Sequence, residues 1–268
     1  MVLPRVLART QESAGRVAAV TSRNLTAVRH RGYWLVVISG LAEPVLYLFS
    51  IGIGVGGLID SVTMPDGTVM RYAAFVAPAM LAASTMTGAM AESTFNFFAK
   101  MKWTKLYDAV VATPVRPFEV ALGELAWALA RGWVYAAAFL ALIVALDLST
   151  IGMAVLALPA ALLVGIAFGS VGMAIATTMR TWQDFDYLSV LQFSLFLFSG
   201  TFVPVTAYGP VLQAVVEVTP LYHSVELLRD ITTDRLNWTT LVHVGYLIAM
   251  TLVGLAIASR RINKLLCK

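Results

Sequence analysis

IGMAVLALPAALLVGIAFGSVGMAIATT, residues 151–178, contains no charged side chain and no alternation of apolar and polar positions. An uncharged apolar run of about 20 residues is long enough to cross the hydrocarbon core of a bilayer as a helix. Because the run is continuous rather than alternating, it indicates a membrane helix and not a strand of a membrane barrel. This stretch therefore places the chain among integral membrane proteins.

The composition of the whole chain agrees with this class. Of its 268 residues, 59% are hydrophobic and 13% are charged, and the mean hydropathy is +0.80. A soluble domain is about one quarter charged. We predict an all-α integral membrane protein with six spans. They are expected at about 34–57, 72–95, 122–147, 151–178, 187–207 and 241–259.

Two other segments have helical patterns without being long enough to span. In residues 1–31, apolar positions recur every three or four residues and arginines recur every seventh, which predicts an amphipathic helix in the headgroup layer. The alternative is a frayed tail whose arginines only set the orientation of the chain in the membrane. In residues 208–240 we expect one or two short re-entrant or interfacial helices, packed against protein. Residues 32–268 are expected to form a single transmembrane domain.

The positive charges predict the orientation of the chain. With the N-terminus inside, most of the 19 Lys and Arg residues fall on inside segments, and only Arg71, Arg229 and Arg235 fall outside. This bias follows the positive-inside rule, so both termini are expected in the cytoplasm. The Ala-, Val- and Arg-rich composition favours a bacterial plasma membrane. The net charge of +4 needs no nucleic-acid partner to explain it.

The loop after the second span has an unusual design. Residues 100–124 read KMKWTKLYDAVVATPVRPFEVALGE, with helical spacing of apolar residues before Thr113-Pro114. The residue before proline is forced out of the α region, and Pro117 is well placed to begin the next helix. We interpret the loop as a short amphipathic cytoplasmic helix that docks to something delivering force. A stiff loop that only fixes topology is the alternative.

Charged residues within or near the spans are candidates for special contacts. They are Glu43, Glu92, Glu124 and Arg131. Such groups usually face protein or a water-filled cavity. Glu124 and Arg131 lie two turns apart on one helix, so each is expected to have its partner on another span. Glu43 is the candidate for a transport pathway, Glu92 is expected near the cytoplasmic interface, and an internal ion pair is an alternative for Arg131.

Several motifs carry little chemistry. Gly52, Gly54 and Gly57 fit G-x-G-x-x-G but lack the strand and helix of a dinucleotide site. The pair Gly165 and Gly169 permits close helix approach, within the chain or between subunits. No phosphate-loop sequence occurs, so this chain is not expected to be an ATPase.

Enzyme and metal functions have weak support in the sequence. Ser199 and His243 lie in or near spans, but the G-x-S-G pattern of an intramembrane serine protease is absent. His243 is expected at the membrane interface, and His30 and His223 at membrane edges and far apart, so we expect no metal cluster. The single Cys267 excludes a disulfide framework within one chain.

Two segments resemble one transporter family. Residues 75–115, FVAPAMLAASTMTGAMAESTFNFFAKMKWTKLYDAVVATPV, and residues 219–230, TPLYHSVELLRD, resemble signatures of the permease subunits of ABC-2-type exporters. The first segment is especially similar to the branch that contains the nodulation-factor (lipo-oligosaccharide) exporter permease and antibiotic-resistance permeases. With the interfacial helix and six spans, the resemblance covers nearly the whole chain.

The resemblance implies an exporter with several partners. Two permeases, either two copies or two homologous chains, would pair in lipid above two cytoplasmic ABC ATPase subunits. Those subunits would bind ATP and Mg²⁺, so no cofactor is expected in this chain. The residues expected to couple to the ATPase are Leu106, Tyr107, Asp108, Thr113 and Pro114.

The family also implies a substrate route along spans one and five. Its expected residues are Glu43, Tyr47, Phe193, Phe196 and Gly200, with a helix bend at Gly200. Ordinary packing is the alternative for the phenylalanines. The expected substrate is amphipathic, such as a glycolipid or lipid-linked saccharide, and a drug or antibiotic is the alternative. A passive channel or membrane scaffold is a more distant alternative for the function.

Overall fold

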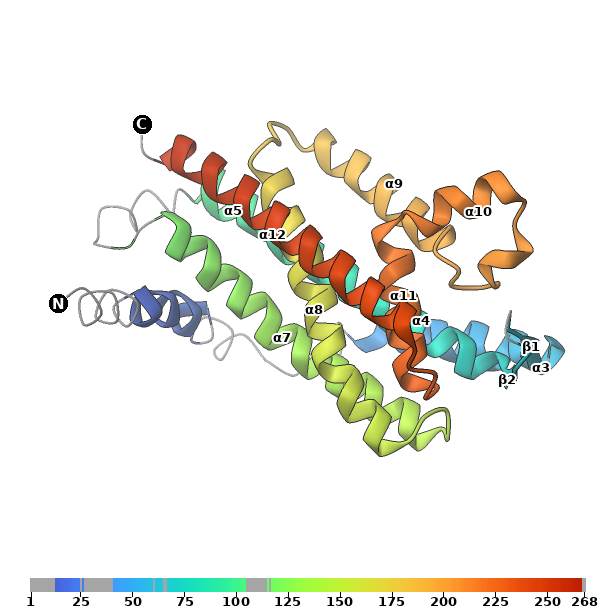
Figure 1. The fold of residues 1–268 in the computed structure, drawn as a ribbon. Coiled ribbons are helices and arrows are strands. Elements are labelled where there is room, and N and C mark those ends of the chain that lie inside the picture. The colour runs from blue at the N-terminus through green and yellow to red at the C-terminus, as the bar shows by residue number, and fades with distance from the viewer. Residues whose placement is uncertain are drawn as a thin grey trace.

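The computed structural model describes residues 13–24, 26, 41–59, 61–64, 67–104, 115 and 117–266. In these ranges the chain is nearly all helical, which confirms the predicted class (Figure 1). Of the predicted cytoplasmic helix around residues 100–112, only residues 100–104 are described, and residues 105–114 lie outside the described part of the chain.

Five helices in the described part are long and apolar enough to cross a membrane. They are Leu41–Ile59, Tyr72–Lys102, α7 (Pro117–Ala145), α8 (Ile151–Ala176) and α12 (Trp238–Leu266). The first includes the π-helical stretch η1 (Leu48–Val55) and ends in α3 (Gly56–Ile59). The second combines α4 (Tyr72–Ala91), η2 (Glu92–Asn96) and α5 (Phe97–Lys102), and is longer than the predicted span 72–95.

The predicted fifth span differs most from the structure. Instead of one helix over residues 187–207, the chain forms α9 (Gln183–Leu197) and then a turn in which Gly200 has φ +71°. A helix of 15 residues is about 22 Å long, shorter than a hydrocarbon core of about 30 Å. The helix therefore ends before Gly200 rather than bending there, and the six-span count stays a prediction.

Between α9 and α12 the chain forms short helices, as expected for residues 208–240. They are η3 (Val205–Ala207), α10 (Pro210–Glu217) and α11 (Pro220–Thr232). Thr219 caps α11 by accepting a hydrogen bond from the backbone N–H of Tyr222 at 3.4 Å, and Pro220 occupies its first turn. Their position relative to a bilayer stays a prediction.

One element was not predicted, a small antiparallel hairpin of β1 (Ser61–Thr63) and β2 (Val69–Arg71). Ser61 pairs with Arg71 and Thr63 with Val69. The sequence between the strands, MPDGT, contains the Pro-Asp-Gly signal of a turn, and Gly67 has φ +83°. That signal could have revealed the hairpin.

The centre of the bundle is α4, which packs against α8, α11, η1 and α7. Its side chains are buried around most of its circumference, as expected for a helix that is apolar on all sides. The pair Gly165 and Gly169 of α8 faces Leu129 and Leu125 of α7. A Cβ atom at Gly169 would lie 2.7 Å from Leu125 Cδ1, so this glycine serves close packing within the chain.

The two ends of the bundle are distinct (Figure 1). Residues 13–24 and the end of α12 lie at one end, which we call the terminal end. The strands β1 and β2 lie at the other, which we call the hairpin end. The helix of residues 13–24 packs on the start of α7, where the Thr21 hydroxyl donates to Gly123 O at 3.1 Å.

Candidate functional site

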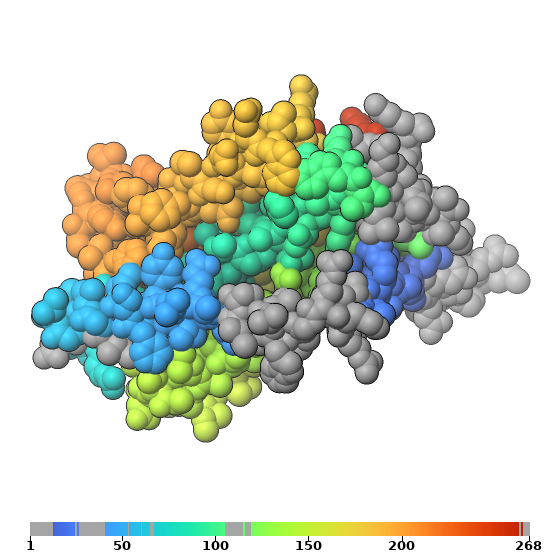
Figure 2. All heavy atoms as spheres, turned by 180° about the vertical axis from the view of Figure 1, so that it is seen from behind, coloured from blue at the N-terminus to red at the C-terminus, as the bar shows by residue number. Residues whose placement is uncertain are grey.

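A cavity of about 440 Å³ lies between the helix Leu41–Ile59, the α4–η2 helix and α9. We call it the α9 cavity. In the space-filling view, α4 forms the floor of a hollow between the other two helices (Figure 2). Of the 15 residues of α9, all of which are described, only Leu188 is buried. This helix therefore forms a thin, mostly exposed wall.

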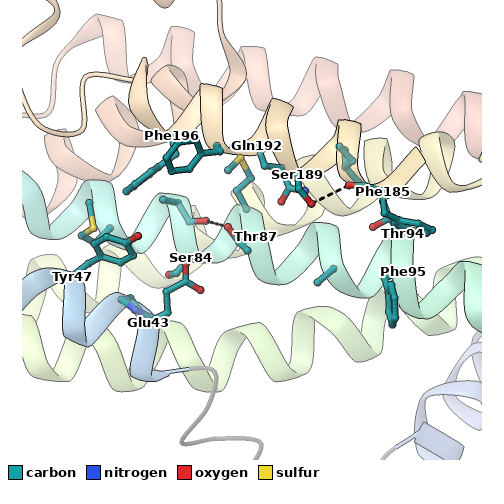
Figure 3. A pocket seen from close by; sticks show the side chains of 17 residues that line it. Glu43, Tyr47, Ser84, Thr87, Thr94, Phe95, Phe185, Ser189, Gln192 and Phe196 are labelled. Atoms are coloured by element: carbon teal, nitrogen blue, oxygen red, sulfur yellow. Dashed lines mark hydrogen bonds between the residues drawn. The ribbon is translucent and has the colours of Figure 1, made fainter. Parts of the chain in front are cut away.

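The floor of the cavity has a polar stripe at helical spacing. Ser84, Thr87 and Thr94 of the α4–η2 helix lie on one face and line the cavity (Figure 3). Their hydroxyls donate to backbone carbonyls of their own helix, and Thr87 Oγ1 lies 3.0 Å from Ala83 O. Because the proton of each hydroxyl is used in this way, the oxygen lone pairs remain as acceptors for a ligand.

The opposite wall of the cavity also carries hydrogen-bonding side chains. Ser189 of α9 donates to Phe185 O at 2.9 Å and presents its lone pairs, and Gln192 adds an amide with both donors and an acceptor. The Glu43 carboxylate enters from the first helix, and within the described residues it has no ion pair or side-chain hydrogen bond. The middle of the cavity is thus rich in hydrogen-bond acceptors and carries one negative charge.

Aromatic rings lie at both ends of the cavity (Figure 3). The hairpin ring group consists of Tyr47, Phe196 and Phe202, with ring centroids 5.7 Å apart for Tyr47–Phe196 and 5.2 Å for Phe196–Phe202. The terminal ring cluster contains five rings, linked by edge and tilted contacts. Its members are Phe95, Phe98, Trp103, Trp182 and Phe185.

Four of the five predicted route residues line this one cavity. Glu43 and Tyr47 come from the first helix, and Phe193 and Phe196 come from α9. Gly200 does not line it, because it lies in the turn beyond α9. The coupling residues Leu106, Tyr107, Asp108, Thr113 and Pro114 lie outside the described residues.

The polar stripe was not predicted from the sequence. Its signal was present, since Ser84, Thr87, Ala91 and Thr94 recur at helical spacing along one face of a span. The ring cluster was not predicted either, because Trp103 and Trp182 are far apart in sequence and flank different helices, α5 and α9.

Of the four charged residues within or near the spans, Glu92, Glu124 and Arg131 form ion pairs between elements, and Glu43 has none among the described residues. Arg131 of α7 pairs with Glu92 of η2, which confirms an internal ion pair. Glu124 accepts from Arg23 Nη2 at 2.7 Å, Asn24 Nδ2 at 2.9 Å and Lys100 Nζ at 2.5 Å. These contacts join residues 13–24, α5 and α7 at the terminal end.

A smaller cavity of about 240 Å³ adjoins Glu43 from the other side, between the first helix, α4, α7 and α8. It is lined mainly by apolar side chains, with Arg131 and Tyr135 at one edge. Glu43 and Pro44 line both cavities. The carboxylate of Glu43 therefore lies at the boundary of the two spaces.

Two histidines meet in a way that was not predicted, and His30 lies outside the described residues. His223 of α11 and His243 of α12 lie side by side, with their Nδ1 atoms 2.7 Å apart, and Tyr246 stacks on His223. They lie 20 positions apart in sequence but meet because α11 and α12 pack together. Among the described residues no group of three or more metal-binding side chains surrounds them.

Comparison with known proteins agrees with the resemblance. Residues 16–233 match the family described as "ABC-2 type transporter". The chain is 30% identical over 234 residues to "Nodulation protein J" of Rhizobium leguminosarum bv. viciae, covering 85% of this chain and 88% of the relative. It is 31% identical over 253 residues to the protein of the same name from R. leguminosarum bv. trifolii, covering 90% and 95%. For Rhizobium meliloti (strain 1021) the identity is 31% over 210 residues, covering 78% and 77%. The chain belongs to the ABC-2 type transporter family, as a membrane-spanning permease of the branch that includes Nodulation protein J.

Proposed function

We propose that the chain is the permease of an ATP-driven exporter, and that the α9 cavity takes the head group of an amphipathic glycolipid during transport. The observation that carries this proposal is the chemistry of the cavity wall. Hydroxyl and amide groups line its middle, and aromatic rings line both ends. A sugar has hydroxyl donors for such acceptors and apolar faces for such rings, and an acyl chain packs against phenylalanine.

The charge of the cavity argues against substrates with a phosphate or diphosphate head group. Glu43 lines it, and no Lys or Arg is among the described residues that do. A phosphate or diphosphate head group would therefore meet a carboxylate and no cation, and Arg and Lys are the side chains that bind phosphate. The proposal favours a glycolipid whose head group is uncharged over a saccharide linked through a diphosphate.

The proposal sets the orientation of the bundle. Basic residues gather at the terminal end, among them Arg23, Lys100, Arg260 and Arg261, so this end is taken as cytoplasmic and the hairpin end as the outer face. Both termini are then cytoplasmic in a bacterial plasma membrane. The helix α9, together with the turn that follows it, serves as the sixth span.

Partners are proposed at two places. Two ABC ATPase subunits bind at the terminal end through residues 105–114, next to α5, and a second permease covers the exposed face of α9. That face carries Tyr187, Val190 and Phe193, which are 76%, 66% and 59% exposed. Such a continuous apolar face is consistent with a subunit interface within the membrane.

A cationic drug is the second candidate substrate, and Glu43 is the observation that favours it. A carboxylate that lines a cavity without an ion-pair partner attracts a positive charge. For a cationic amphiphile, Glu43 would supply the main attraction. For an uncharged glycolipid it would be one acceptor among several.

The test is reconstitution of the permease with the ABC ATPase encoded beside it. ATP-driven movement of three labelled lipids across vesicles would be compared: an uncharged glycolipid, a polyprenyl diphosphate saccharide and a cationic amphiphile. We expect a complex of two permeases and two ATPases that moves the uncharged glycolipid best. Failure of the ATPase to bind, or movement unaffected by Gln192→Ala together with Phe196→Ala, would contradict the proposal.

A further inference from the structure

A buried arginine that does not line the α9 cavity holds the turn after α9. Arg229 of α11 is 1% exposed, which makes it one of the largest fully buried side chains among the described residues. Its Nη2 donates to Gly200 O at 2.8 Å, in the turn that ends α9. Its Nε donates to Phe75 O at 3.3 Å, in α4.

Two further contacts fix the orientation of this guanidinium. Its Cζ atom lies 3.9 Å from the centroid of the Phe75 ring, within range of a cation–π interaction. Its Nη1 pairs with Glu226, one turn earlier on α11. One side chain thus joins α4, α11 and the turn after α9.

A second hydrogen bond holds the same turn. The Tyr72 hydroxyl, at the start of α4, donates to Phe202 O at 3.2 Å. Phe202 contacts Phe196, and Phe196 lines the α9 cavity. The position of the turn therefore sets the position of the rings at the hairpin end of the cavity.

We propose that Arg229 is a positioning residue that holds the turn after α9 against α4, and so keeps the hairpin end of the α9 cavity closed in the resting protein. When the hairpin end opens, the bond to Gly200 O breaks while the bonds to Phe75 O and Glu226 remain. The proposal deepens the proposed function, since it assigns the outer closure of the transport route. Its geometry does not depend on the substrate.

The test measures access to the cavity rather than transport. In a Cys267→Ser background, Ser189→Cys places one thiol in the cavity wall, and a charged maleimide is applied to either face of sealed vesicles. Val69→Cys in β2 and Lys102→Cys at the end of α5 identify the two faces, because both positions are exposed. The open side of the cavity faces lipid or the partner subunit, which a charged reagent does not cross.

Three variants of the arginines are compared. Arg229→Gln should raise labelling from the hairpin side by about tenfold, because losing a charge-assisted hydrogen bond shifts an equilibrium by roughly that factor. Arg229→Lys keeps the charge but lacks the fork that reaches two carbonyls, so a smaller rise is expected. Arg235→Gln is the matched control, since Arg235 donates to Thr233 in its own segment. Labelling from the terminal side should not change.

Each result has one meaning. Unchanged labelling of Arg229→Gln at normal membrane abundance would overturn the proposal. If Arg229→Gln does not accumulate, Arg229→Lys decides, and labelling equal to that of the parent overturns the proposal. A rise without any ATP-driven transport by the parent protein would support the role of Arg229 and reject the proposed function. If labelling does not rise in Arg229→Gln but the parent protein transports substrate, the role of Arg229 is rejected and the proposed function is supported.

Discussion

The two ends of α9 are attached to the bundle by different kinds of interaction. At the terminal end, Trp182 and Phe185 contact rings of η2 and the end of α5, and the Trp103 and Trp182 centroids are 4.2 Å apart. Both indoles are 49% exposed. At the hairpin end, buried Arg229 and Tyr72 donate hydrogen bonds to backbone carbonyls of the turn.

These interactions differ in what their separation costs. Aromatic rings can slide or part without leaving a polar group unsatisfied, and each pair contributes about 0.5–1.5 kcal/mol beyond burial. Breaking the bond from a buried guanidinium leaves a charged donor without one of its acceptors, at a cost of roughly 1.5–3 kcal/mol. Because rings can slide past one another and stay in contact, whereas a lost bond to Gly200 O leaves a buried donor unsatisfied, we expect the terminal end to open more easily at rest.

This asymmetry suits an exporter. In the proposed orientation, a cavity that opens readily toward the cytoplasm would load substrate without ATP, while a firmly held outer end would prevent leakage. The end of α5 carries Trp103, directly before residues 105–114. Force applied there by an ATPase would reach the ring cluster first.

The largest expected effect concerns the turn at the hairpin end. Gly200→Val places a β-branched side chain at φ +71°, where a Cβ atom would lie 2.7 Å from Val205 Cγ2. Strain and overpacking together should lower the free energy of unfolding by about 2–4 kcal/mol. Thermal unfolding in detergent would measure this. The control, Gly245→Ala, lies in α12 with no neighbouring atom near a new Cβ, and should leave stability unchanged or slightly raised.

A smaller effect on the free energy of unfolding is expected at the terminal end. A double-mutant cycle of Trp103→Leu and Trp182→Leu should give a coupling energy of about 1 kcal/mol, because the rings contact each other. The matched cycle replaces Trp103 and Trp133, an indole on α7 with similar exposure and no ring contact in the described part of the chain. A coupling for the second pair as large as for the first would remove the basis of the comparison.

A substitution in the polar stripe, which lies between the two ends, should change substrate binding without changing how either end of α9 is attached to the bundle. Thr87→Val removes one acceptor while keeping the side-chain shape, so the KM for a glycolipid should rise by about threefold to tenfold, as for one lost hydrogen bond. Stability should change by less than about 0.5 kcal/mol. Thr178→Val, which removes an exposed hydroxyl beyond the end of α8, is the control. An unchanged KM in Thr87→Val would place the substrate elsewhere.

The smallest effect is expected for the charge at Glu43. Glu43→Gln keeps an acceptor, so transport of an uncharged glycolipid should change by less than about twofold. Transport of a cationic amphiphile should fall by about tenfold, since a charge contact at a protein surface contributes roughly that much or more. Competition between the two labelled lipids in one vesicle preparation would measure both. Loss of glycolipid transport with retained transport of the cation would reverse this assignment.

Much of the helical framework could be predicted, because hydropathy is a local signal. The span 151–178 matches α8 within two residues, since its flanks carry Thr150 as a cap and polar residues after Ala176. The end of α9 could not be predicted in this way. The sequence stays apolar through Phe198 and Phe202, so no change of composition marks the break before Gly200.

The parts of the site that were missed depend on tertiary packing. Arg229 lies in the pattern LLRDI, which is typical of a polar helix face, yet its acceptors are carbonyls 29 and 154 positions away. Likewise, His223 and His243 meet only because of the register between α11 and α12. By contrast, Glu43 could be chosen because a charge within a span is unusual in itself, and Phe196 because the family resemblance implied a route along span five.

The comparison of the two ends rests on which of them opens more easily in the resting protein. The direct measurement is the rate at which the thiol of Ser189→Cys, in the Cys267→Ser background, reacts with a charged maleimide applied to each face without ATP. We predict a rate about tenfold higher from the face marked by Lys102→Cys than from the face marked by Val69→Cys, which corresponds to a difference of about 1.4 kcal/mol in the cost of opening. Equal rates, or faster reaction from the hairpin side, would contradict it.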